Sequence, residues 1–85
     1  MQNITDEQKA AIEAKGLTVK QFHVIADMLC NWEDTPDQEM ADCLANEGVQ
    51  RPVIAEVIAL RQQAFSTPVP LLDVVKGRLV IDSAL

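Results

Sequence analysis

His23 is the single histidine of the sequence and its most plausible catalytic group. Lys20 and Asp27 stand three and four residues away, so a helix would place all three on one side. A histidine beside a carboxylate is a pair that general-base catalysis uses, but no nucleophile stands in a recognisable setting, since Ser66 and Ser83 fall in a linker and a tail. The sequence therefore predicts a surface pair and a protein that is not an enzyme.

Metal ligands and phosphate-binding loops are also scarce. Cys30, Cys43 and the distant His23 do not reach the four closely spaced ligands of a structural zinc site. The three glycines stand singly, so no glycine-rich loop is present to hold a phosphate. We therefore predict no metal and no cofactor. Both cysteines are expected on apolar helix faces, as small buried side chains in a reducing compartment.

Charges are unevenly distributed along the chain. Its 85 residues carry a formal net charge of −6, and seven acidic residues but no lysine or arginine stand between Lys20 and Arg51. Such an interval either keeps a rather hydrophobic protein in solution or forms a surface that binds a basic protein partner. For the second alternative, the expected contacts are Trp32, Glu33, Asp34, Asp37 and Asp42.

Three helix starts are marked by a threonine followed three positions later by a glutamine, at Thr5, Thr18 and Thr35. In such a capping box the threonine hydroxyl accepts the glutamine N–H, and the glutamine side chain accepts the threonine N–H. Pro36 suits the first position of the third helix, because its missing N–H costs nothing there. Apolar periodicity predicts a fourth helix. The four expected helices span about 6–15, 19–32, 36–46 and 52–65.

The pattern changes after the fourth helix. Two prolines in "STPVP" cannot continue a helix and favour an extended backbone. In "LLDVVKGRLVID", a turn at Lys76 and Gly77 would set Val74 opposite Leu79 and create one wholly apolar face. This pattern predicts a β-hairpin, which must pack on the helices or on a second chain, because an isolated two-stranded ribbon is marginally stable.

The stretch "EMADCLANEGVQRPVIAEV", from Glu39 to Val57, resembles the helix-turn-helix superfamily. Ala41 is the small residue of the first helix, a leucine follows three positions later, and Gly48 with its hydrophobic neighbour forms the turn. The longer turn and Pro52 depart from the tightest form of the motif. With a helix before it and a hairpin after it, the order of elements is similar to that of a winged helix.

The resemblance implies that helix 52–65 enters the major groove of DNA, with glutamine pairing to adenine and arginine to guanine or a phosphate. The expected DNA contacts, from this helix, its entry and the hairpin, are Gln50, Arg51, Arg61, Gln62, Lys76 and Arg78. The acidic interval opposes phosphate binding, and symmetric dimerisation would double the basic surface. A DNA reader and an acidic protein-binding module are thus both compatible with the sequence.

Length and hydropathy restrict the class of protein. A chain of 85 residues, 48% of them hydrophobic, makes one small domain whose stability is modest, so a homo-oligomer is expected. No apolar run approaches the ~18 residues of a membrane helix, and the N-terminus lacks the features of a signal peptide, so we expect a cytoplasmic protein without a membrane segment.

The resulting hypothesis is a mainly α fold of four helices with a helix-turn-helix core and a C-terminal β-hairpin. We divide the chain into a helical domain, 1–65, a proline-containing linker, 66–70, and the hairpin, 71–85. The expected function is that of a small non-enzymatic regulatory or assembly module of bacterial or phage type. Its partner is either DNA or a basic surface of a nucleic-acid-handling protein.

Overall fold

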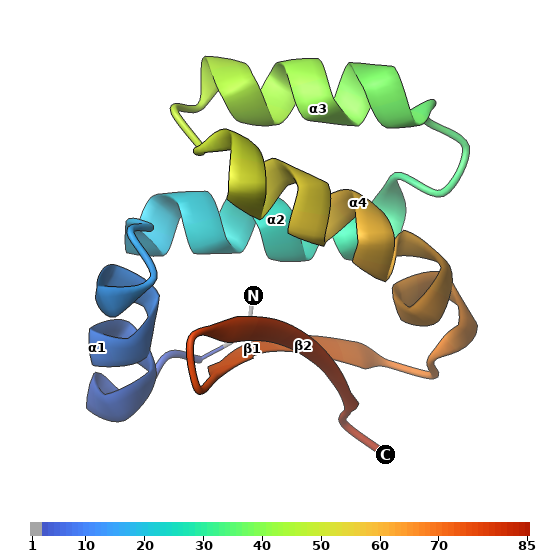
Figure 1. Cartoon of the computed structure of the whole chain (residues 1–85). Helices are drawn as coiled ribbons and strands as arrows, with labels where there is room; N and C mark the ends of the chain where they lie inside the picture. Colours follow the sequence, from blue (N-terminus) through green and yellow to red (C-terminus); the bar gives the residue numbers. More distant parts are fainter. Residues whose placement is uncertain (1–2) are drawn as a thin grey trace.

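Within residues 3–85, which the computed structural model describes, the chain forms four helices followed by a two-stranded antiparallel hairpin (Figure 1). This confirms the predicted mainly α fold with a C-terminal hairpin. None of these helices is long and apolar enough to span a membrane. The elements are α1 (Asp6–Ala14), α2 (Val19–Asn31), α3 (Asp37–Asn46), α4 (Arg51–Ser66), β1 (Pro70–Val75) and β2 (Arg78–Ser83).

Helices α2 and α4 form the middle layer of the molecule (Figure 1). Helix α3 packs on one side of this layer and the hairpin covers the other side. Helix α1 stands at one end, where it contacts both α2 and β1. The arrangement places the tip of the hairpin near the end of α1.

Two of the three predicted capping boxes are confirmed. Thr5 and Thr18 accept the N–H of the glutamine three residues later at 3.1 and 3.0 Å, and each glutamine side chain accepts the threonine N–H in return. The third prediction is wrong, because α3 begins at Asp37 with Pro36 as its N-cap and has no side-chain cap. Thr35 lies in the preceding turn, where its N–H donates to Trp32 O at 3.2 Å.

The predicted turn of the hairpin is confirmed. Lys76 and Gly77 have φ values of 53° and 74°, which is the left-handed geometry that a two-residue hairpin turn requires at both positions. Val74 pairs with Leu79, as the alternation of apolar residues predicted. Because the register is fixed, the apolar face of the hairpin turns toward the helices.

One hydrophobic core joins the helices and the hairpin. Its fully buried side chains come mainly from α2, α3 and α4, and the hairpin adds three residues that are 2–7% exposed. The hairpin therefore packs on the helices of its own chain. The largest fully buried side chains are Phe22, Ile12, Ile25, Leu29, Met40, Leu44 and Val57, and the hairpin adds Leu72, Val74 and Leu79.

Candidate functional site

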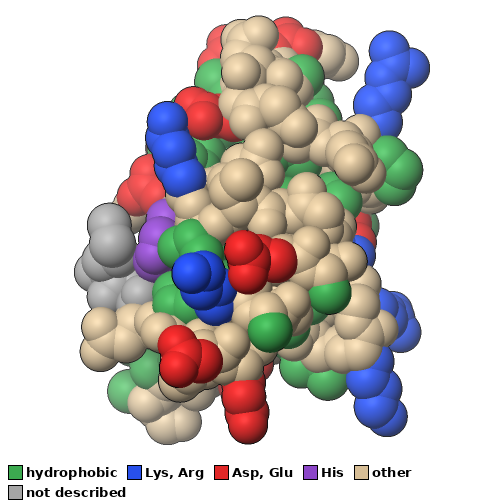
Figure 2. Space-filling view, turned by 90° about the vertical axis from the view of Figure 1, so that its left-hand side faces the viewer, with side chains coloured by type: hydrophobic (Ala, Val, Ile, Leu, Met, Phe, Trp, Pro, Cys, Tyr) green, Lys and Arg blue, Asp and Glu red, His purple; other side chains and the backbone are tan. Residues whose placement is uncertain are grey.

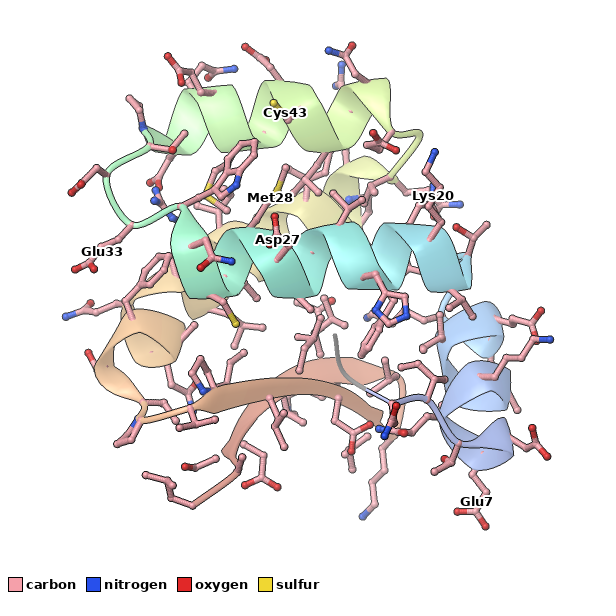
Figure 3. All side chains as sticks on the ribbon, turned by 180° about the vertical axis from the view of Figure 1, so that it is seen from behind. Glu7, Lys20, Asp27, Met28, Glu33 and Cys43 are labelled. Atoms are coloured by element: carbon pink, nitrogen blue, oxygen red, sulfur yellow. The ribbon has the colours of Figure 1, made fainter. Side chains whose placement is uncertain are left out.

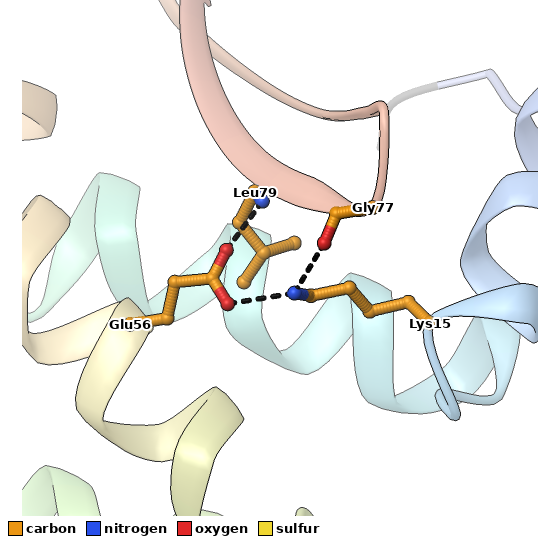
Figure 4. A network of polar contacts seen from close by, with 4 residues as sticks. All are labelled: Lys15, Glu56, Gly77 and Leu79. Carbon is orange, nitrogen blue, oxygen red and sulfur yellow. Dashed lines mark hydrogen bonds and ion pairs between the residues drawn. The ribbon is translucent and has the colours of Figure 1, made fainter.

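The start of α4 and the tip of the hairpin are tied together by a network of polar contacts (Figure 4). Glu56, in the second turn of α4, accepts the N–H of Leu79 at 2.6 Å. Lys15, which follows α1, donates both to Glu56 at 2.7 Å and to Gly77 O at 2.6 Å. Three segments that are distant in sequence thus meet at one end of the molecule.

Besides Lys9 of α1, four exposed cations lie at this end. Arg51 is the first residue of α4, and Lys76 and Arg78 belong to the tip of the hairpin. Lys20 projects from the start of α2 at the same end (Figure 3). Figure 2 faces this end and shows Lys and Arg side chains at its upper left, near its centre and along its right-hand edge, with Asp and Glu side chains between them. We call Lys20, Arg51, Lys76 and Arg78 the basic end.

Sequence reasoning found three of these cations and missed Lys20. Lys20 belongs to α2, outside the helix-turn-helix stretch, and only the packing of α2 beside the start of α4 brings it to the basic end. Gln50, the N-cap of α4, is exposed at the same place, and its side chain lies near Gly16. Gln62 is exposed farther along α4.

The side chain of Arg61 is largely buried and bonded to other residues of the chain. Its guanidinium donates to Trp32 O at 2.7 Å and to Glu33 O at 3.2 Å, and it forms an ion pair with Asp37. The side chain is only 13% exposed, and its guanidinium lies 5.7 Å from the ring centre of Phe65. Contact between Arg61 and DNA, as the sequence predicted, would require breaking these bonds.

Apart from Asp42, which lies in the middle of α3, the predicted acidic surface lies at the other end of α2. Figure 3 shows Glu33 at one end of this helix and Lys20 at the opposite end. Glu33, Asp34 and Asp42 are exposed, whereas Trp32 packs partly against the core. The fold thus separates Glu33 and Asp34 from the basic end, whereas Glu47 lies beside the start of α2 and Asp42 shares a groove with Arg51.

Opposing effects act on the pKa of the Glu56 carboxylate. Partial burial raises its pKa, but the hydrogen bonds from Lys15 and the Leu79 N–H, with the nearby charges of Lys15 and Arg78, lower it more. Its pKa therefore lies below the ordinary value of 4.5. Because the folded pKa is below the unfolded one, the ionised carboxylate stabilises the fold above about pH 4.5, and this contribution is lost as the pH falls through the folded pKa.

We predict that Glu56→Gln lowers the free energy of unfolding by about 1–2 kcal/mol at pH 7 and by less at pH 3. Urea titrations at both pH values measure this difference. Glu13→Gln, an exposed change on α1, is the matched control and should leave the pH dependence of the wild type intact. An equal loss of stability at pH 3 and pH 7 would contradict the role given to the ionised carboxylate.

The edges of the hairpin offer few free donors to an added strand. Three backbone N–H groups donate to carboxylates: Val74 to Asp73 at 2.8 Å, Leu79 to Glu56 at 2.6 Å and Ser83 to Asp82 at 2.8 Å. Pairing with a neighbouring strand needs such groups free. The hairpin is therefore poorly suited to bind a partner through its edges.

A groove of about 520 Å³ between α2 and β1 holds the residues first considered for catalysis. His23, Asp27 and Cys30 line it from one side of α2, and Asp27 accepts a hydrogen bond from Asn31 at 2.9 Å. Within residues 3–85, no group of histidines, cysteines and carboxylates is arranged to hold a metal ion.

The prediction that both cysteines are buried is wrong for Cys30. Its thiol is exposed, 3.9 Å from Pro70 O, because Cys30 shares the side of α2 that carries His23 and Asp27 and faces away from the core. Cys43 is half-buried, and neither thiol is in a disulfide.

Comparisons with protein-family models, with curated proteins and with solved structures find no match for this chain.

Proposed function

We propose that this protein is a small non-enzymatic regulatory or assembly module that binds the phosphate backbone of DNA with its basic end. The observation that carries the proposal is the convergence of exposed cations from three separate segments, the start of α2, the start of α4 and the tip of the hairpin. Affinity for DNA comes largely from cations that neutralise phosphates. A net charge of −6 opposes binding less where acidic residues such as Glu33 and Asp34 lie at the opposite end of α2 from these cations.

The start of α4 adds a favourable dipole to this surface. A helix N-terminus carries partial positive charge and attracts phosphate groups. The N-cap residue, Gln50, makes no side-chain hydrogen bond to the first turn of α4. In the helix-turn-helix hypothesis, α4 then lies along the DNA and Gln62, roughly 16 Å farther along its axis, contacts a base.

The proposal predicts salt-sensitive binding to a labelled random-sequence duplex, measured by fluorescence anisotropy. Four phosphate contacts should weaken the affinity about 100-fold between about 50 and 200 mM salt. Replacing both Lys76 and Arg78 with glutamine should weaken binding about tenfold at the lower salt and reduce the salt dependence by about two contacts.

The control for charge is Gln63→Glu, an exposed change on α4 outside the basic end. It lowers the net charge by one, half the change of the double variant, so about half of any loss of binding free energy caused by net charge alone would appear in this variant too. We expect its affinity to stay within about twofold of the wild type. Absence of binding at low salt, or equal losses in both variants, would contradict the proposal.

A second candidate function is recognition of a basic protein surface by the acidic surface. It is favoured by Glu33, Asp34 and Asp42, which are exposed and outside the two ion pairs formed within residues 3–85. Replacing Asp34 and Asp42 with asparagine should abolish capture of such a partner from cell extract and leave DNA binding intact. Asp37 is excluded from this test because it pairs with Arg61.

A further inference from the structure

An apolar groove of about 630 Å³ runs between α3 and α4. Ala45, Ala55 and Ala59 on its walls are exposed, and Ile58 is only partly buried. The exposed apolar side chains of the groove are small, and polar side chains border them. Its apolar lining consists of Ala41, Ala45, Ile54, Ala55, Ile58 and Ala59.

The groove also carries one acidic and one basic side chain. Asp42 lines it from α3 and accepts a hydrogen bond from Gln38 at 2.9 Å, and Arg51 lines it from the start of α4. Neither belongs to an ion pair within residues 3–85. A surface with one unpaired charge of each sign can complement its own copy.

We infer that the α3/α4 groove is the interface of a two-fold dimer of this chain. An axis that runs along the groove sets α4 of each copy against α3 of the other. A two-fold axis across the groove would instead set α3 of one copy against α3 of the other. The charged residues of this helix are all acidic, so the two α3 helices would repel each other; they are Asp37, Glu39 and Asp42. The first arrangement is therefore favoured, and it brings Arg51 of each copy to Asp42 of the other.

The same arrangement has a consequence for the basic end. An axis along the groove keeps the starts of both α4 helices at the same end of the dimer, so the two basic ends lie side by side. Because Arg51 of each copy pairs with Asp42 of the other, the cations left to face one ligand are Lys20, Lys76 and Arg78 of both copies. The dimer does not rest on the proposed DNA binding, because the groove residues beyond Arg51 lie outside the basic end. It replaces the base contact given to Gln62 above, because Gln62 lies on the side of α4 that lines the groove, so DNA would be bound through the basic ends alone.

Sedimentation equilibrium of the full chain over a hundredfold range of concentration tests the inference without DNA. We expect a mass that approaches twice 9.4 kDa as the concentration rises. Ala59→Glu places a charge in the groove and should raise the dissociation constant at least tenfold. Gln63→Glu, on α4 but outside the groove lining, is the matched control and should leave it unchanged.

A charge swap tests the predicted pairing. Asp42→Arg and Arg51→Asp should each weaken the dimer about tenfold, because like charges then face each other, and the double variant should recover most of the affinity. Circular dichroism confirms that each variant is folded. A monomer at every concentration would overturn the inference and leave the groove to a different protein. A dimer that tolerates Ala59→Glu, or a double variant as weak as the single ones, would overturn it as well.

Discussion

Removing the hairpin, residues 70–85, is expected to abolish cooperative folding of the four helices. The hairpin contributes Leu72, Val74 and Leu79 to the common core, each less than 8% exposed. Burial of three such side chains contributes about 5–9 kcal/mol, which is comparable with the whole free energy of unfolding expected for a chain of this length, about 4–13 kcal/mol. The shortened chain would also expose the apolar side of α2 and α4 that the hairpin covers.

Thermal unfolding followed by far-ultraviolet circular dichroism measures this effect. The control is a chain that ends at Ala84, because Leu85 is 86% exposed and its removal uncovers no core residue. We expect a cooperative transition in the control and a broad, non-cooperative loss of helix in residues 1–69. A cooperative transition at the wild-type temperature in the shortened chain would show that the helices fold alone and would contradict this expectation.

Local chemistry made much of the fold predictable. The capping boxes at Thr5 and Thr18 need only residues three positions apart, and both form as predicted. The hairpin turn needs two residues with positive φ. Gly77 adopts this geometry without strain, and Lys76 adopts it as well. Thr35 shows the limit of such reasoning, because its turn bond to Trp32 O moves the start of α3 one residue beyond the predicted position.

Contacts between distant segments could not be predicted from local patterns. Lys15 and Glu56 are separated by 41 residues, and the sequence contains no periodicity that would pair them. Their contact depends on which end of α4 the hairpin tip approaches, and that is decided by the packing of the whole core. The same packing brings Lys20 to the basic end, although it belongs to a helix that the helix-turn-helix resemblance leaves out.

The distribution of charge in space also differs from its distribution along the chain. Along the sequence, the acidic interval ends shortly before Arg51, and its negative charges would repel the phosphates of DNA. In the fold, Glu33 and Lys20 lie at opposite ends of α2, so Glu33 and its acidic neighbour Asp34 stand away from the basic end (Figure 3). This separation is the reason that the basic end remains a candidate DNA-binding surface in a protein of net negative charge.

Replacing Arg61 with alanine is expected to lower the free energy of unfolding by about 2–4 kcal/mol. The guanidinium satisfies carbonyl groups of Trp32 and Glu33, at the end of α2, and pairs with Asp37 in the first turn of α3. Its positive charge also lies at the C-terminal end of the α2 dipole, where a cation is stabilising. Arg61→Lys should recover about half of the loss, because an ammonium group cannot make all of these bonds at once.

Urea titration followed by the fluorescence of Trp32, the single tryptophan, measures the effect of Arg61. Asp37→Asn is the control: Asp37 is 66% exposed, so losing its ion pair alone should cost less than about 1 kcal/mol. At a temperature where the Arg61→Lys variant remains folded, its DNA affinity should equal that of the wild type. A variant that keeps its stability and loses DNA binding would instead show Arg61 to be an accessible cation, and would restore it to the DNA-binding residues that the sequence predicted.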